Sequence, residues 1–280
     1  KYEAQYRAEV ERQLSAIADL KASEIVQWRR ERLGDGAVFS RNAAFSNLVR
    51  RLFENPQDLE AQGLLQTWLR QAQESYQYDR ILLIDAQGVQ WMAVPDTPEP
   101  AVRHLSQDVR DVLRSRQIAF LDFHRDAEDR PVRLGVLVSI FEAQDSDEAL
   151  GDEALGDEAL GVLVLRIDPE TYLYPLINRW FQENAALALR FPLDSPNLPA
   201  AMAVQGATGI VEGVDYGSRP VLADVRPIPN SPWFMVARID IAEVYAPLRE
   251  RLAEMALLMG ALLFGAGAGV RVRQGSEGGC

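Results

Sequence analysis

Five short apolar segments in the first two thirds of this chain constrain its fold more than any other feature. They are Arg80–Ile84, Val89–Val94, Gln117–Phe123, Pro131–Glu142 and Gly161–Ile167. The first two are joined by Asp85–Gly88, a turn that Asp opens and Gly closes. Only the second and third are separated by a helical pattern, at Val102–Arg114. Short connections between neighbours favour antiparallel pairing, so we expect a five-stranded antiparallel sheet.

The first forty residues have the pattern of one long amphipathic helix. Apolar residues recur there at spacings of roughly three to five positions, as Val10, Leu14, Ile17, Leu20, Ile25, Trp28 and Leu33. Gly34 and Gly36 interrupt the pattern near its end. We therefore expect a stalk helix over residues 1–40, with further helices over Ala37–Phe53 and Leu59–Tyr76.

A second β-rich unit follows a helix whose start is marked by Asp168 and Pro169. Its expected elements are strands at Ala186–Leu193, Thr208–Gly213, Arg219–Ile228 and Pro232–Asp240 and a short helix at Leu198–Val204. It lacks an opening hairpin like that of the first unit. We expect an α+β chain with one module over residues 41–172 and a second over 173–247, whose completeness stays open.

The segment Met255–Val270 carries no charge over sixteen residues and is followed by Arg271 and Arg273. A membrane span needs about 20 apolar residues, and arginines beside one favour its cytoplasmic side. The alternative is a buried core helix, but the glycines suit that poorly. We predict a transmembrane helix over residues 252–272 with the C-terminus in the cytoplasm.

Composition argues against several classes of function. The net charge of −12 disfavours a nucleic-acid partner. A single cysteine, Cys280, excludes a disulfide framework, and two histidines make a His-rich zinc site a poor hypothesis. No hydrolase, metalloprotease or phosphate-loop motif occurs. We expect a fragment without catalytic activity, cofactor or metal.

The five residues Asp-Glu-Ala-Leu-Gly occur three times in succession over residues 147–161. A period of five matches neither a helix nor a strand, so the acidic side chains would not share a face. The repeat also lacks the alternating ligands of a calcium-binding EF-hand loop. Our interpretation is a lengthened, solvated loop between the fourth and fifth strands.

Several phrases resemble the double Cache sensor domains of bacterial membrane receptors. They are "YLYPLINRW", "TGIVEGVDYGSRPVLADVRPIPNSPWFMVARID", "AEVYAPLRERL", "FLDFHRD", "RLGVLVSIFEA" and "GVLVLRIDPETYLYPL". The resemblance implies two PAS-like modules on one long helix, with the ligand in the membrane-distal one and a first transmembrane helix before Lys1. It implies a dimeric receptor of the bacterial inner membrane whose sensor lies in the periplasm. A sensor histidine kinase is the expected parent, with a diguanylate cyclase or a chemoreceptor as alternatives.

A ligand pocket in such a module needs a few polar groups among apolar walls, between the sheet and its covering helix and loops. Polar residues on the apolar strands are the candidates: Trp91, Asp122, His124, Arg133 and Ser139. Arg133 would hold a carboxylate, Asp122 an amine, and His124 would respond to pH. The ligand would be an amino acid, a carboxylate or an amine.

Each candidate also has a simpler interpretation. Asp122 and His124 would cap the turn that follows them, Arg133 would pair with Asp126 or Glu128, and Trp91 would be a core residue. The alternative function is a membrane-anchored module that binds another protein. A first module closed by bulky side chains would favour that alternative.

Overall fold

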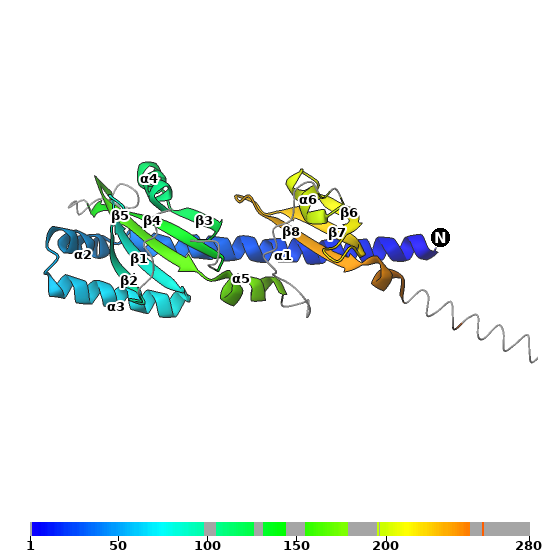
Figure 1. The fold of residues 1–280 in the computed structure, drawn as a ribbon, viewed down its shortest axis with the longest axis horizontal. Helices are drawn as coiled ribbons and strands as arrows, with labels where there is room; N and C mark the ends of the chain where they lie inside the picture. The colour runs from blue at the N-terminus through cyan, green and yellow to red at the C-terminus, as the bar shows by residue number, and fades with distance from the viewer. Residues whose placement is uncertain are drawn as a thin grey trace, which may run out of the picture. The chain divides into compact units, whose positions relative to one another are not determined.

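The computed structural model describes residues 2–97, 105–125, 131–143, 155–178, 195, 197–246 and 254 (Figure 1). The chain divides into two compact units. The larger unit is Glu24–Leu189, and the smaller unit combines Lys1–Ser23 with Arg190–Cys280. Helix α1 (Tyr2–Ser40) contributes residues to both units.

The larger unit contains the five-stranded antiparallel sheet expected from the sequence. Its strands are β1 (Arg80–Asp85), β2 (Gln90–Val94), β3 (Ala119–His124), β4 (Arg133–Ala143) and β5 (Leu155–Ile167). Their order across the sheet is β2-β1-β5-β4-β3, and all neighbours are antiparallel. The helices are α2 (Ala43–Glu54), α3 (Leu59–Tyr76), α4 (Ser106–Ser115) and α5 (Pro169–Asn178).

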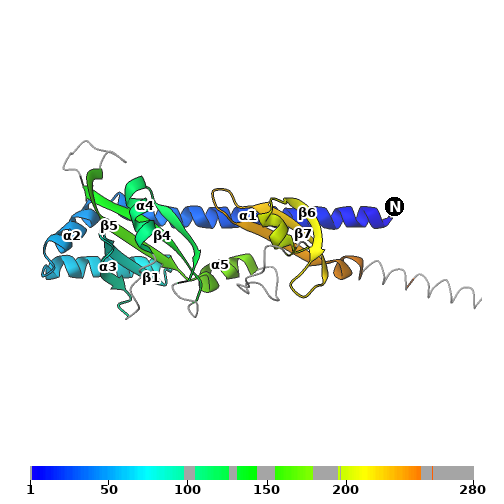
Figure 2. The ribbon, with the colours of Figure 1, turned by 45° about the horizontal axis from the view of Figure 1, so that its top comes forward.

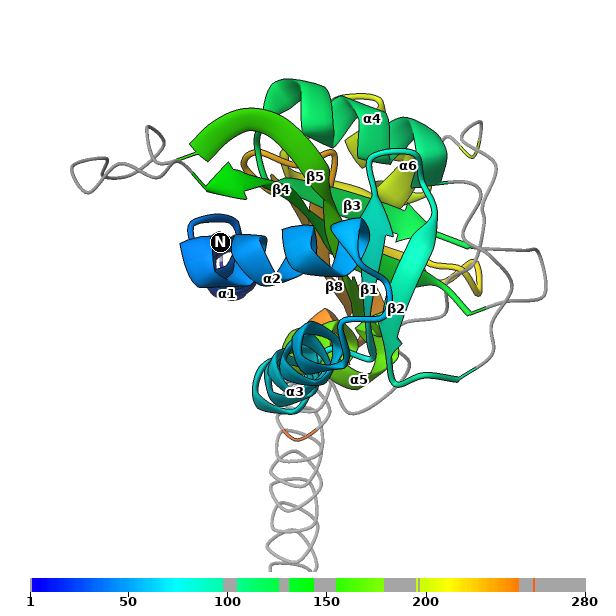
Figure 3. The ribbon, with the colours of Figure 1, turned by 90° about the vertical axis from the view of Figure 1, so that its left-hand side faces the viewer.

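Helices cover both faces of this sheet. Helices α2 and α3 lie on one side of it and α4 on the other (Figure 2), as the end-on view also shows (Figure 3). Successive strand residues alternate between the faces, so both must be apolar. Residues Val162 to Leu165 of the central strand β5 are accordingly all buried. We call the two sides the α2–α3 face and the α4 face.

The second helix begins later than its sequence pattern suggests. We expected it from Ala37, but α1 continues through Gly34 and Gly36 to Ser40. An added Cβ at Gly36 would lie 2.8 Å from Cγ2 of Val138 in β4, so this glycine permits close packing of α1 on the sheet. Helix α2 starts at Ala43, where the side chain of Asn42 accepts a hydrogen bond from the Phe45 N–H.

Part of the five-residue repeat is strand, which corrects the expectation of a loop throughout. Strand β5 begins at Leu155, so the third copy (residues 157–161) lies within it. In that register Ala159 pairs with Phe141 of β4 and Leu155 with Ala143. The third copy therefore forms strand because its backbone pairs with the long strand β4, although its sequence lacks the alternating pattern of a strand. Residues 144–154 lie outside the described part of the chain.

Gly161 ends the repeat at a point where two strands approach closely. A Cβ at this position would lie 2.2 Å from the backbone oxygen of Ile84 in β1. We expect Gly161→Ala to lower the free energy of unfolding by about 3 kcal/mol, because a backbone shift in a packed sheet is costly. Urea denaturation measures this loss.

The matched control is Gly63→Ala in α3, where an added Cβ meets nothing within 4 Å. Alanine is the better helix former, so this substitution should stabilise the chain by about 0.5–1 kcal/mol. A Gly161→Ala variant as stable as the wild type would contradict the close approach.

The smaller unit contains α6 (Pro199–Val204) and a sheet of β6 (Gly209–Val214), β7 (Pro220–Pro227) and β8 (Phe234–Asp240), in that order. The pattern of one helix and three antiparallel strands matches α4, β3, β4 and β5 of the larger unit. Leu14 and Ala18 of α1 pack against Leu222 and Ala237 of this sheet. The strand expected at 186–193 lies outside the described residues.

A buried polar network also connects α1 with β7 in the smaller unit. Asp224 of β7 is completely buried, its Oδ2 accepts a hydrogen bond from Ser15 Oγ, and Nη2 of Arg226 forms an ion pair with that oxygen at 3.1 Å. Nε of Arg226 lies 2.7 Å from Asp19 Oδ1. Removing one partner from such a network would leave a buried charge unpaired. The network therefore helps to fix the position of α1 on this sheet.

An aspartate closes the turn between β6 and β7. Asp215 Oδ1 accepts hydrogen bonds from the backbone N–H groups of Gly217 and Arg219, both at 2.8 Å. Its Oδ2 lies 2.8 Å from Nη1 of Arg238 in β8. The Arg219 N–H first, and then the Arg238 guanidinium, lower the pKa of Asp215 to about 2.

This lowered pKa predicts a specific pH dependence. The ionised carboxylate stabilises the fold above its usual pKa of 3.8, and that contribution is lost as the pH falls through about 2. At about pH 6 we expect Asp215→Asn to cost about 2 kcal/mol, measured by hydrogen exchange in β6 and β7. The difference from wild type should shrink towards pH 2, whereas a difference independent of pH would exclude the carboxylate charge as its source.

Among the described residues, no helix combines the length and the apolar character needed to cross a membrane. The span predicted over 252–272 lies outside those residues, apart from Glu254.

Candidate functional site

The register of the larger sheet brings arginines from three strands to one end of the α4 face. Arg80 of β1 pairs with Arg166 of β5, which pairs in turn with Gly135 of β4. Arg133 lies two residues before Gly135 and therefore shares its face. Leu137, the next residue on this face of β4, belongs to the apolar cluster under α4.

Two aspartates contact Arg133, and one of them also contacts Arg166. Asp79 Oδ2 accepts a hydrogen bond from Arg166 Nε at 2.8 Å and lies 3.3 Å from Arg133 Nε. Arg133 Nη1 donates to Asp168 Oδ1 at 3.1 Å. Arg80 donates from Nη1 and Nη2 to the hydroxyl and carbonyl oxygens of Thr97, at 3.0 and 2.7 Å. We call Asp79, Arg80, Arg133, Arg166 and Asp168 the arginine cluster.

The side chains of the arginine cluster are largely buried, which strengthens the interactions among their charges. Arg80 is 2% exposed, and the side chains of the other four are between 12% and 23% exposed. Burial raises the pKa of Asp79, while the guanidinium groups of Arg166 and Arg133 act in the opposite direction. Asp79 Oδ1 is buried and has no hydrogen-bond partner among the described residues. These five side chains carry one more positive than negative charge, which suits an anion.

The cluster is connected to the start of helix α5 through Asp168. Asp168 Oδ2 accepts a hydrogen bond from Thr171 Oγ1 at 2.7 Å, and its Oδ1 accepts one from the Glu170 N–H at 3.2 Å. The expected helix start at this aspartate is therefore confirmed. Burial, followed by the charges of Glu170 and Asp168, raises the pKa of Tyr174 in α5. The same carboxylate thus both holds Arg133 and caps α5.

Apolar side chains fill the α4 face beyond the arginine cluster. The strands contribute Leu82, Ile84, Ala93, Leu137, Val162 and Val164, and the α4 segment contributes Leu105, Val109 and Val112. Ser139, a predicted ligand contact, is 3% exposed on this face, as the cross-strand partner of Val162. Its position along β4 is six residues from Arg133, or about 20 Å. The structure therefore separates these two candidates.

His124 and Arg133 are the predicted residues that the structure brings together. They are cross-strand partners at the end of β3 and β4. His124 Nδ1 lies 2.9 Å from the backbone oxygen of Asp122. The acidic partners of Arg133 that the structure describes are Asp79 and Asp168, while Asp126 and Glu128 lie outside the described residues.

Asp122 and Trp91 lie on the opposite, α2–α3 side. Asp122 Oδ1 is 3.9 Å from Nη1 of Arg29 in α1. The Trp91 indole N–H donates to Asp85 Oδ2 at 2.7 Å, and its ring centroid lies 4.8 Å from that of Phe53 in α2. The five predicted contacts therefore do not converge on one site.

Sequence reasoning missed Asp79, Arg80, Arg166 and Asp168 as members of a site. The available signal was charge directly beside apolar strands, in "YDRILLID" and "VLVLRIDP". Such charges usually lie at solvated strand ends, so the pattern alone does not indicate a buried cluster. Among the described residues no group of three or more histidine, cysteine, aspartate or glutamate side chains could hold a metal ion.

Comparison with known proteins identifies the fold. No protein-family model and no curated protein matches the chain. The chain is similar to the ligand-binding domain of the amino acid chemoreceptor PctB of Pseudomonas aeruginosa in complex with L-Gln, at a TM-score of 0.58 and 14% identity. That match covers 86% of this chain and 97% of the other.

Two further solved structures agree with it. The sensory domain of the Campylobacter jejuni chemoreceptor Tlp3 with isoleucine bound matches at a TM-score of 0.57 and 9% identity, over 86% of this chain and 97% of the other. The ligand-binding domain of the Pseudomonas fluorescens chemoreceptor CtaA with L-serine matches at 0.53 and 14% identity, over 84% and 98%.

The chain has the double Cache fold. The resemblance inferred from the sequence is thereby confirmed. At 9–14% identity the likeness concerns the fold of the double Cache domain and not its ligand.

We expect Asp79→Asn to destabilise the double Cache domain by about 3 kcal/mol in urea unfolding. It removes the negative charge shared by Arg133 and Arg166 in a mostly buried site, so the positive charge of the two guanidinium groups is less well offset. The matched control is Asp111→Asn, whose exposed contact with Arg114 is 3.7 Å long. That change should cost less than about 0.5 kcal/mol, and equal losses in the two variants would contradict the assignment.

Proposed function

We propose that this chain is the extracytoplasmic ligand-sensing domain of a bacterial transmembrane receptor. The observation that carries the proposal is the arginine cluster, a set of largely buried guanidinium groups on the α4 face of the larger sheet. The double Cache fold supports it, because the solved structures of that fold named above are chemoreceptor sensor domains with amino acids bound.

The ligand that we propose is a carboxylate. A guanidinium group presents paired donors in one plane, which match the two oxygens of a carboxylate. A ligand carboxylate at Arg133 competes with Asp168, whose other oxygen receives the Thr171 hydroxyl at the start of α5. Ligand binding then shifts the population of two arrangements of α5, the helix that follows β5.

The proposed parent receptor is a sensor histidine kinase, with a diguanylate cyclase or a chemoreceptor as alternatives. In this proposal residues 252–272 cross the inner membrane, the sensor lies in the periplasm, and the receptor is a homodimer. Of the predicted contacts Arg133, His124, Asp122, Ser139 and Trp91, we propose that Arg133 binds the carboxylate with His124 beside it. The other three lie away from the arginine cluster.

A thermal-shift screen with carboxylates, amino acids and amines tests the proposal. We expect carboxylates to raise the melting temperature and amines without an acidic group to have no effect. A ligand at one hundred times its dissociation constant adds about 2.7 kcal/mol of stability. Arg133→Lys keeps the charge but loses the planar pair of donors, so its shift with the same ligand should fall by more than half.

The control for this screen is Arg114→Lys, whose side chain is 79% exposed in α4. Its shift should equal that of the wild type. Equal shifts in Arg133→Lys and wild type would place the ligand elsewhere, and shifts with amines alone would contradict a carboxylate ligand.

A second candidate is a module that binds another protein and no small molecule. The observation in its favour is the apolar filling of the α4 face, where Leu137, Val162 and Val164 pack under α4. The screen distinguishes the two functions. No shift with any compound, together with specific capture of one periplasmic protein, would favour the second candidate.

A further inference from the structure

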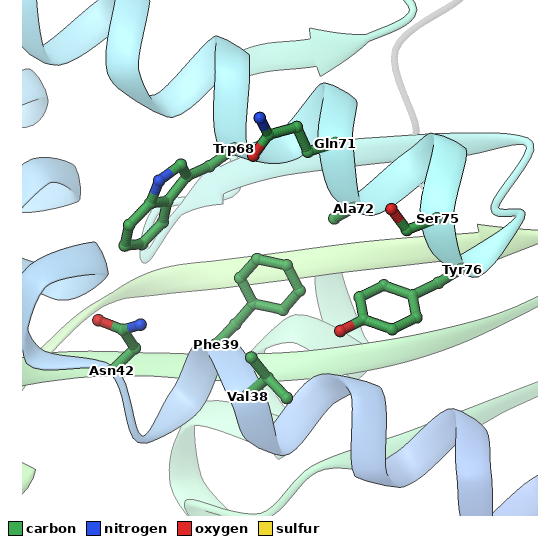
Figure 4. A pocket seen from close by; sticks show the side chains of 8 residues that line it. All are labelled: Val38, Phe39, Asn42, Trp68, Gln71, Ala72, Ser75 and Tyr76. Carbon is green, nitrogen blue, oxygen red and sulfur yellow. The ribbon is translucent and has the colours of Figure 1, made fainter.

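A pocket of about 250 Å³, which is largely open to solvent and which we call the cavity, lies between the end of α1 and helix α3, within the larger unit. It is lined by Val38, Phe39, Asn42, Trp68, Gln71, Ala72, Ser75 and Tyr76 (Figure 4). None of these residues belongs to the arginine cluster. Helix α3 contacts β1 and β2 on the α2–α3 side of the sheet, so the cavity is separate from the α4 face.

One wall of the cavity is aromatic and held by ring contacts. The rings of Phe45 and Trp68 are nearly parallel, with centroids 5.8 Å apart. Phe39 meets Phe45 edge to face, with centroids 5.2 Å apart. Phe39 of the lining is buried, and the buried Phe45, which is not part of the lining, contacts the rings of both Phe39 and Trp68, so these two rings are held in place without a ligand. Preformed ring faces favour an aromatic ligand.

The remaining lining is polar apart from Val38 and Ala72, and it carries no charged side chain. Asn42, Gln71, Ser75 and Tyr76 supply amide and hydroxyl groups. Oδ1 of Asn42 accepts the Phe45 N–H, which fixes the orientation of that amide. In Figure 4 the Tyr76 ring and the Trp68 ring lie at opposite ends, with Phe39 between them. An ionic ligand would find no counter-charge in this lining, whereas a neutral ligand with one polar group would be satisfied.

The volume limits the size of the ligand. An apolar protein cavity of about 150 Å³ accommodates benzene. A cavity of about 250 Å³ therefore suits one substituted ring or two fused rings. We propose that this cavity is a second binding site, for a small neutral aromatic compound that carries one hydrogen-bonding group, such as a phenol or an indole. A ligand there contacts α1 directly, through Val38 and Phe39.

Indole and 4-methylphenol are the probes, and benzoate is the charged comparison. We expect both neutral probes to bind saturably to the 280-residue chain in isothermal titration calorimetry, and benzoate to bind at least tenfold more weakly at this site. Protein labelled with fluorotryptophan has five fluorine signals, one for each tryptophan. The signal assigned to Trp68 by Trp68→Phe should shift during the titration with a neutral probe.

Two variants of the lining test the location. Ala72 is buried and contributes its methyl group to the wall, so Ala72→Leu fills the cavity and should weaken both neutral probes at least tenfold. Tyr76→Phe removes one hydroxyl and should weaken 4-methylphenol about fivefold. The matched control, Ala44→Leu, makes the same change at an exposed position of α2 outside the cavity and should bind as the wild type does.

Circular dichroism first establishes that Ala72→Leu and Ala44→Leu are folded, and the Trp68 signal then reports on the cavity itself. If Ala72→Leu does not fold, Ser75→Leu on the same wall takes its place with the same expected loss. Absence of saturable binding of both neutral probes would overturn the proposal. So would equal affinity in the filled variant and the wild type, or a titration in which the Trp68 signal does not move.

Discussion

The register of β1, β5 and β4 is the constraint on which the rest of the larger unit depends. Strand β5 is buried on both faces, and its residues 162 to 165 are all apolar and buried. A slip of β5 by one residue would move each of its side chains to the other face of the sheet, Arg166 included. In the observed register Arg80, Arg166 and Gly135 lie in one row on the α4 face. The sheet core therefore determines where the arginine cluster forms.

The arginine cluster lies where the apolar core of the sheet ends, so its charges are largely removed from water. Two guanidinium groups share Asp79, so this carboxylate offsets part of the desolvation of both. Asp168 has two tasks, because it accepts from Arg133 and from the hydroxyl of Thr171 in α5. Asp168 therefore connects Arg133 directly to the start of α5. The cavity between α1 and α3 has the opposite character, with aromatic and neutral polar walls.

The two units repeat one layout at different sizes. In each, a short helix precedes three antiparallel strands in consecutive order, and α1 packs on the face away from that helix. Aspartates close the β1–β2 and β6–β7 turns in the same way, since Asp85 and Asp215 each accept two backbone N–H groups from the following residues. The smaller unit differs in its buried network, where Asp224 contacts α1 through Ser15. The buried network of the smaller unit thus connects its sheet to α1, whereas the arginine cluster of the larger unit connects its sheet to α5.

Local pattern was enough to determine the long helix α1, the five antiparallel strands, the turn at Asp85 and the helix start at Asp168, because these depend on periodicity and on neighbours within a few residues. It was not enough for the start of α2, because packing at Gly36 lets α1 continue to Ser40. It was also not enough for the strand within the repeat, because pairing with β4 extends β5 back to Leu155. The site depended still more on tertiary structure. Arg133 could be selected as a polar residue on an apolar strand, but Asp79 lies 54 positions away from it in sequence and only 3.3 Å away in space. Such a partner is determined by strand order and register, which a single strand does not encode in its own residues.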